Sequence, residues 1–188
     1  MSLTRDGVEA GHSSGQEKLT RLMRMMKHDR AEMHVRAGME AADKKDWVSA
    51  VEELLRALDL FGEMEDRTRA ASVHNSLSLC YFALGRLSKA ETESRRAARM
   101  MREASDPEGE ATALLGLGNV LLARGDLQAS ERTFMKAFSI FRTQCIWDGV
   151  MRSQLGLERV ALMKGDKRQA ERAREEAERA RRQLANGS

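Results

Sequence analysis

Apolar residues recur at helical spacing along most of the chain, in blocks of forty residues. When the blocks start at Ala31, Ala71, Ala111 and Met151, equivalent columns carry similar residues without any gap. The twenty-seventh column is alanine in all four blocks, and the fifteenth is glycine in three of them. Similarity at a fixed period of this length is typical of stacked supersecondary units. The sequence therefore predicts four structural repeats, over 31–70, 71–110, 111–150 and 151–188.

Each block has the pattern of two helices separated by a short turn. In the third block the apolar residues of the first helix follow an i, i+3, i+7, i+8 pattern: Leu114, Leu117, Leu121 and Leu122. Gly125 then favours the left-handed conformation that ends a helix, and Asp126 can cap the next one. Asp106 followed by Pro107 predicts another helix start. We therefore expect helix–turn–helix repeats throughout the array.

A single helix pair cannot bury its apolar face, whereas stacked pairs can, each contacting only its neighbours. The predicted fold is therefore an all-α solenoid of four repeats. Composition agrees, because the chain is 41% hydrophobic but only 4% aromatic, with one proline. The last helix, from Lys167 to Gln183, mixes cations and acids around a thin alanine stripe. We expect it to be a charged cap on the array rather than an RNA-binding arm.

The N-terminal part divides into two segments before the array. Residues 1–16 are rich in glycine, serine and other polar residues, so we expect a disordered tail. Residues 17–30 form an amphipathic pattern, with Leu19, Leu22, Met23 and Met26 on one stripe. This extra helix could cover the open end of the first repeat, contact a partner or the protein's own groove, or rest on an anionic membrane. The sequence leaves these three roles open.

Charge and apolar runs exclude several classes of protein. The 32 cations and 29 acids give a net charge of +3 and are mixed along the chain, whereas nucleic-acid binders concentrate cations on one face. No apolar run approaches the roughly 18 to 20 residues of a membrane helix. The first residues lack the apolar core of a secretory signal, so we expect a cytoplasmic protein. Cys80 and Cys145 are isolated, and we expect buried thiols rather than a disulfide or a metal site.

The repeats resemble those of the tetratricopeptide repeat family, in its subset with extended, forty-residue repeats. The third block supplies Leu114, Leu117, Gly118, Leu121, Gly125, Ser130, Phe134 and Ala137. The second block supplies Leu77, Tyr81, Gly85, Ala90 and Ala97. This resemblance implies a right-handed superhelix whose first helices line a concave groove. It also implies an adaptor or scaffold that binds a segment of a partner protein there.

The groove positions of that family can be carried over residue by residue. They imply the following partner-binding set: Val35, Met39, Asn75, Leu79, Phe82, Leu115, Asn119, Leu122, Arg152, Leu155, Arg159 and Leu162. The apolar members would bury a partner's side chains. The asparagines would bond its backbone, unless they are merely solvated, and the arginines would pair with a carboxylate.

We find no motif of a catalytic site, so we expect neither an enzyme nor a cofactor. His34 and His74 share the fourth column, and we expect them to pack between helices rather than bind a metal. An alternative role is self-association, in which the N-terminal helix of this or another copy fills the groove and gives a homo-oligomer. Nucleic-acid binding through the basic termini is a third, weaker alternative.

Overall fold

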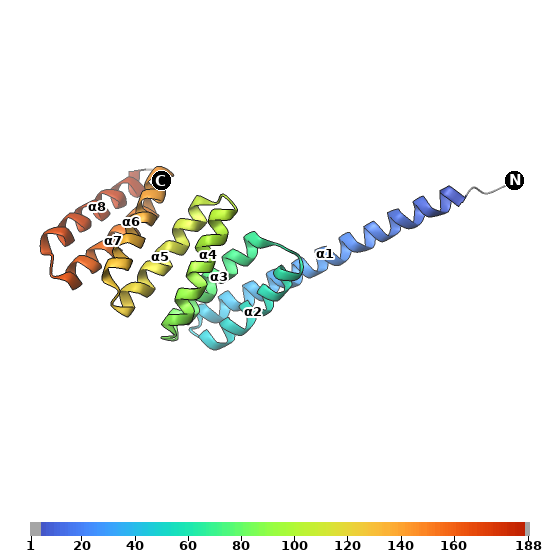
Figure 1. Ribbon diagram of the computed structural model, residues 1–188, viewed down its shortest axis with the longest axis horizontal. Helices are drawn as coiled ribbons and strands as arrows, with labels where there is room; N and C mark the ends of the chain where they lie inside the picture. The colour runs from blue at the N-terminus through green and yellow to red at the C-terminus, as the bar shows by residue number, and fades with distance from the viewer. Residues whose placement is uncertain (1–4, 187–188) are drawn as a thin grey trace.

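The structure, a computed structural model, describes the backbone of residues 5–186 and the side chains of 15–185. Eight helices and no strand occur within that range: α1 (Arg5–Asp43), α2 (Trp47–Glu63), α3 (Arg67–Ala83), α4 (Leu87–Glu103), α5 (Pro107–Arg124), α6 (Leu127–Thr143), α7 (Trp147–Lys164) and α8 (Lys167–Asn186). Each helix packs mainly against its neighbours in sequence, so the pairs form successive layers (Figure 1). The α-solenoid predicted from the sequence is confirmed.

The forty-residue period reappears in the helix boundaries. The second helices begin at Trp47, Leu87, Leu127 and Lys167, and three of the first helices begin at Arg67, Pro107 and Trp147. Pro107 is the first residue of α5, and the Asp106 carboxylate accepts a hydrogen bond from the Gly109 N–H at 2.8 Å. Gly125 is left-handed, with φ of 82°, as predicted for a helix end. Asp126, however, makes no capping bond.

The first helix corrects the expected division of the N-terminal part. We expected a disordered tail over 1–16 and a separate helix over 17–30. The structure instead has one 39-residue helix, α1, from Arg5 to Asp43, and residues 1–4 lie outside the described range. No proline interrupts this segment. Because extending a formed helix costs much less than nucleating one, the part of α1 docked on α2 supports the rest.

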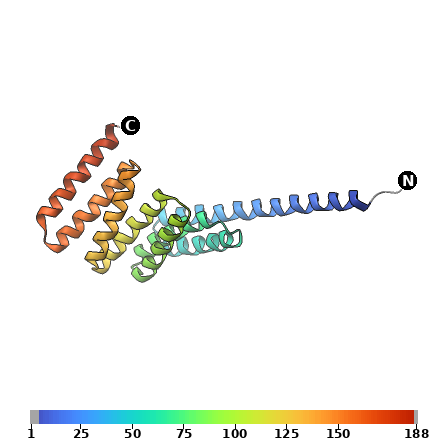
Figure 2. The ribbon, with the colours of Figure 1, turned by 45° about the horizontal axis from the view of Figure 1, so that its top comes forward.

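The N-terminal half of α1 extends beyond the stacked layers as a free arm (Figures 1 and 2). Its side chains are exposed from Gly15 to Lys27. At the base of this arm Lys27 Nζ pairs with a Glu63 carboxylate oxygen at 2.8 Å, and Arg24 donates to the Met64 carbonyl at 3.4 Å. The helix is therefore anchored to α2 only from about residue 24 onwards.

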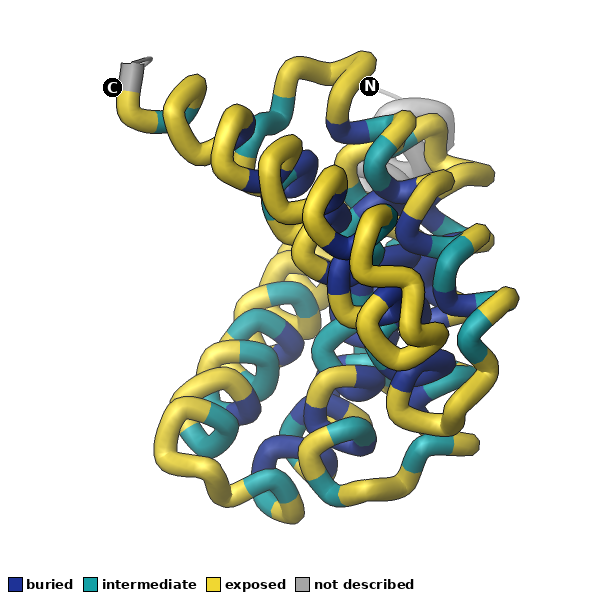
Figure 3. The backbone as a smooth tube through the Cα atoms, turned by 90° about the vertical axis from the view of Figure 1, so that its left-hand side faces the viewer, coloured by how far each residue is buried: buried dark blue, intermediate teal, exposed yellow. Residues whose placement is uncertain are grey.

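Aromatic rings of second helices pack directly onto the backbone of first helices. Phe134 of α6 is 1% exposed and lies between Gly118 of α5 and Gly156 of α7. A Cβ atom at either glycine would lie 2.6 Å from the ring. Phe141 meets Gly149 in the same way. These contacts bring the layers close together, and the buried residues lie between them (Figure 3).

Two histidines are held by carboxylates at the interface between the helices of a pair. The Nδ1 atoms of His34 and His74 lie 2.6 Å from carboxylate oxygens of Glu53 and Glu93, respectively. Both pairs bridge the two helices of one repeat. In the described part of the chain no group of three His, Cys, Asp or Glu side chains could hold a metal ion, and no helix is long and apolar enough to cross a membrane.

The expectation of two buried thiols is wrong for one of them. Cys80 is buried in α3, but Cys145 is exposed in the turn before α7. Its backbone is left-handed, with φ of 56°, in the turn between two layers. The repeat register carried a signal for this, because Cys145 shares its column with the polar residues Glu65 and Ser105, whose backbones are also left-handed. Burial raises the pKa of the Cys80 thiol, which further lowers its reactivity.

We therefore expect the two cysteines to react with a thiol reagent at very different rates. Cys145 should react within seconds to minutes in the native protein, and Cys80 only after unfolding. A Cys145→Ser variant should show almost no reactive thiol until denaturant is added, as measured by absorbance with a disulfide reagent. Equal rates for both thiols in the native protein would contradict the placement of Cys80 in the core.

A pair of glycine substitutions in α5 tests the contact between the Phe134 ring and the first helix of its own repeat. Gly118→Ala places a methyl group against the Phe134 ring and should lower the free energy of unfolding by about 1–3 kcal/mol. Gly116→Ala has room, since its nearest neighbour would be 3.6 Å away. It should be neutral or stabilising by up to about 1 kcal/mol, through higher helix propensity. Urea unfolding measures both, and equal stability of the two variants would contradict this packing.

Candidate functional site

The first helices α1, α3, α5 and α7 together form one side of the array, which we call the groove face. Two hollows open on it. The first hollow lies between α1, α3 and α5 and has a volume of about 570 Å³. The second hollow lies between α5 and α7 and has a volume of about 190 Å³. The groove face is therefore divided into two subsites along the length of the array.

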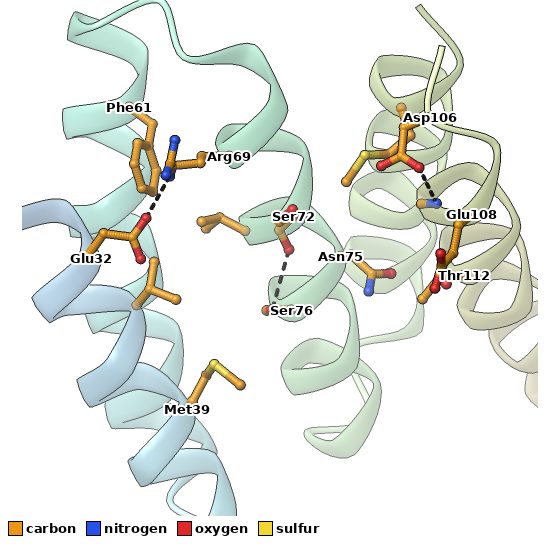
Figure 4. A pocket seen from close by; sticks show the side chains of 14 residues that line it. Glu32, Met39, Phe61, Arg69, Ser72, Asn75, Ser76, Asp106, Glu108 and Thr112 are labelled. Atoms are coloured by element: carbon orange, nitrogen blue, oxygen red, sulfur yellow. Dashed lines mark hydrogen bonds and ion pairs between the residues drawn. The ribbon is translucent and has the colours of Figure 1, made fainter. Parts of the chain in front are cut away.

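The first hollow has polar side chains set among apolar ones, and apolar atoms make up the larger part of its exposed lining (Figure 4). Arg69 Nε donates to a Glu32 carboxylate oxygen at 2.7 Å, which ties α3 to α1 at one end. Asn75 and Thr112 face each other across the hollow from α3 and α5. No described residue forms a hydrogen bond with the Asn75 side chain, so its amide can both donate and accept. Met39 supplies an exposed apolar edge.

The charged groups of the first hollow mostly satisfy one another. Hydrogen bonds to Glu32 and then to Asp66 raise the pKa of the Arg69 guanidinium. The Asp106 carboxylate is used as the cap of α5. Glu108 is exposed at the rim and has no described ion-pair partner. The hollow therefore offers hydroxyl and amide groups with a slight excess of negative charge.

The second hollow carries arginines over an apolar floor. Arg159 Nη1 donates to the Asn119 side-chain oxygen at 3.1 Å, and Asn119 Nδ2 donates to the Leu115 carbonyl at 3.1 Å. Asn119 therefore holds a guanidinium group from the next layer at the mouth of the hollow. Arg152 lies beside it, with Nη1 3.6 Å from an Asp148 carboxylate oxygen. A carboxylate next to an apolar side chain fits this arrangement.

Most members of the expected set lie on the groove face. Val35, Met39 and Asn75 line the first hollow, and the second hollow is lined by Leu115, Asn119, Arg152, Leu155 and Arg159. Leu79 is 54% exposed on α3, one turn beyond Asn75. Leu162 is also 54% exposed, and it borders a further hollow beside α8. Phe82 is half-buried and packs against the core.

Two expected contact residues are buried instead. Leu122 is 3% exposed and belongs to the core around α5, so it cannot contact a partner on the groove face. Leu115 is also 3% exposed and contributes only to the floor of the second hollow. Both belong to α5, which lies between layers on both sides and is apolar around most of its circumference. The family positions alone do not account for this extra burial.

Sequence reasoning missed the polar character of the first hollow. It did not single out Arg69 or Ser76, although both line this space. The sequence did contain a signal for these residues, because Arg69 lies three residues before Ser72 and Ser76 lies four after it, which places all three on one helix face.

The expectation that the N-terminal helix could fill the protein's own groove is wrong for this structure, since the arm of α1 extends away from the array (Figure 2).

Comparisons with known proteins show the fold alone. No family model matches this sequence, and no curated protein matches it. The solved structure of BtubC (BKLC) from P. vanneervenii is similar with a TM-score of 0.76 and 17% identity, over 96% of this chain and 77% of that one. Aspartyl phosphate phosphatase F from Bacillus subtilis is similar with a TM-score of 0.79 and 13% identity. The match covers 84% of this chain but only 41% of the phosphatase. The chain therefore has a helical-repeat fold found in other proteins.

Proposed function

We propose that the repeats are of the tetratricopeptide type and that the protein is an adaptor, which binds a segment of a partner protein along the groove face. The observation that carries this proposal is the pair of exposed leucines, Leu79 and Leu155, on the same face as the arginine held by Asn119. Apolar anchors beside a fixed guanidinium group are typical of a binding surface.

The leucines would supply most of the affinity for the partner, and the arginines would set the orientation of the bound segment. Leu79 and Leu155 are 54% and 42% exposed, so a partner that covers them would gain about 1 kcal/mol or more from each. Arg152 and Arg159 would pair with a carboxylate of the partner at the second hollow. The slightly acidic first hollow would accept polar or basic groups. The partner segment would therefore run with its acidic end over α7.

A binding role, rather than catalysis, is also supported by how the charged groups are used. In the first hollow Glu32 pairs with Arg69, and Asp106 caps a helix. In the second hollow Arg159 is bonded to Asn119. These interactions fix the shape of the surface. We therefore propose that the protein positions a partner without transforming it.

Glutamate substitutions on the groove face test the proposal. Leu79→Glu with Leu155→Glu should weaken partner binding more than tenfold, because each removes an apolar anchor and adds a charge that must be desolvated. A matched control makes the same change on the second helices, at Leu55 and Met135, which are 41% and 55% exposed. Both variants should keep the helical circular dichroism of the parent protein.

Binding is measured by affinity capture from native lysate followed by titration of the captured partner. We expect the groove-face variant to lose the partner and the control variant to retain it. Retention by both variants, with unchanged affinity, would contradict the groove-face assignment. Loss by the control variant alone would place the binding surface on the second helices instead.

A further inference from the structure

The free arm of α1 carries a stripe of exposed apolar side chains. Leu19, Leu22, Met23 and Met26 are each more than half exposed, and so is Met33, about two turns further along the stripe. Residues are about 100° apart around a helix, so these five fall within a sector of about 100°. A stripe of this kind without a partner is costly in water and indicates an interaction surface.

Most of the stripe faces away from the rest of the protein, and Met23 at its edge borders a hollow beside Glu63 and Met64 at the end of α2. The side of α1 that packs on α2 is marked by Ala31, which is fully buried, and by Gly38, where a Cβ would lie 2.9 Å from Leu54. That side is about 120° from the stripe around the helix, and the groove face is about 150° from it. The array therefore lies behind α1 as seen from the stripe. A flat surface can therefore touch Leu19, Leu22 and Met26 without meeting the array.

The arm is also strongly cationic. Between Glu17 and Arg30 it has five cations and two carboxylates, a net charge of +3 with His28 neutral. Lys18 lies along one edge of the stripe and exposed Arg30 lies within its sector, whereas Lys27 at the other edge is paired with Glu63 of α2. Long basic side chains at the edges of an apolar stripe can reach the headgroups while the stripe enters the interface.

Charge decides between a bilayer and a second copy of the chain as the occupant. Two arms packed together would each bring a net charge of +3 into contact, and antiparallel pairing about Leu22 and Met23 would place Lys18 against Lys27. Like charges brought this close together repel each other. An anionic lipid surface instead attracts each of these cations.

We propose that the arm of α1 binds the surface of an anionic lipid bilayer, with Leu19, Leu22, Met23 and Met26 in the headgroup region. The helix lies parallel to the surface and does not span it. This places the array, with its groove face, outside the bilayer and open to a partner. The inference does not depend on the groove-face proposal, because the two surfaces share no residue.

Flotation of the full-length protein with vesicles tests the inference. We expect binding to vesicles of phosphatidylcholine and phosphatidylserine in a three-to-one mixture, and little binding to phosphatidylcholine alone. Added salt should weaken binding, since the cations are solvated at the surface. Lys18→Gln with Arg30→Gln, at the edge of the stripe and within its sector, should also weaken it, by about tenfold.

Two neighbouring methionines provide a matched pair of variants. Met26 lies in the stripe, whereas Met25 is about 100° from its centre, and both are more than half exposed. Both substitutions change the charge equally. The lipid concentration needed for half-maximal binding should be about tenfold higher for the Met26→Glu variant than for the Met25→Glu variant. Unchanged circular dichroism of both variants excludes unfolding as the cause.

Three results would overturn the inference. The first is no flotation of the parent protein with phosphatidylserine vesicles at low salt. The second is an equal effect of the Met25 and Met26 substitutions. The third is a parent protein that sediments as a dimer and becomes monomeric on Met26→Glu, since this would assign the stripe to a second copy of the chain.

Discussion

Contact between a phenylalanine ring and the backbone of two first helices holds the third and fourth repeats of this array together. Phe134 reaches the backbone of α5 and of α7 at once, because Gly118 and Gly156 have no side chain there. The same ring therefore joins the two helices of its own repeat to the first helix of the next. A side chain in place of Gly118 would push apart the two helices of the third repeat, and one in place of Gly156 would separate the third repeat from the fourth.

Close stacking of this kind leaves defined surfaces free for function. Helices of inner layers are covered by their pair and by the layers on both sides, and only the outer sides of the first and second helices remain exposed. The groove face is one of these sides, and Arg159 with Asn119 shows that it is shared between layers. At the N-terminal end no layer covers α1, so the stripe around Met26 and Met33 stays exposed. Both the groove face and the stripe on α1 are exposed because each helix pair is covered only by its neighbouring pairs.

The sequence was sufficient for the repeat architecture and insufficient for the details of burial. The forty-residue period predicted the helix pairs, because apolar spacing and the Asp106-Pro107 start are local signals. Most expected groove residues lie on the groove face for the same reason. Leu122 was expected on the groove face but is buried, because burial depends on how many layers surround α5. The continuity of α1 was missed because glycine and serine suggested disorder, whereas docking on α2 supports the helix.

Site-specific photo-crosslinking tests most directly whether the groove face holds a partner polypeptide. A photoreactive residue at Ser76, in the first hollow, is compared with one at Arg95, on the exposed side of α4. The account predicts a crosslinked polypeptide from position 76 and none from position 95. Crosslinking from position 95 alone would contradict it, because the partner would then lie against the second helices.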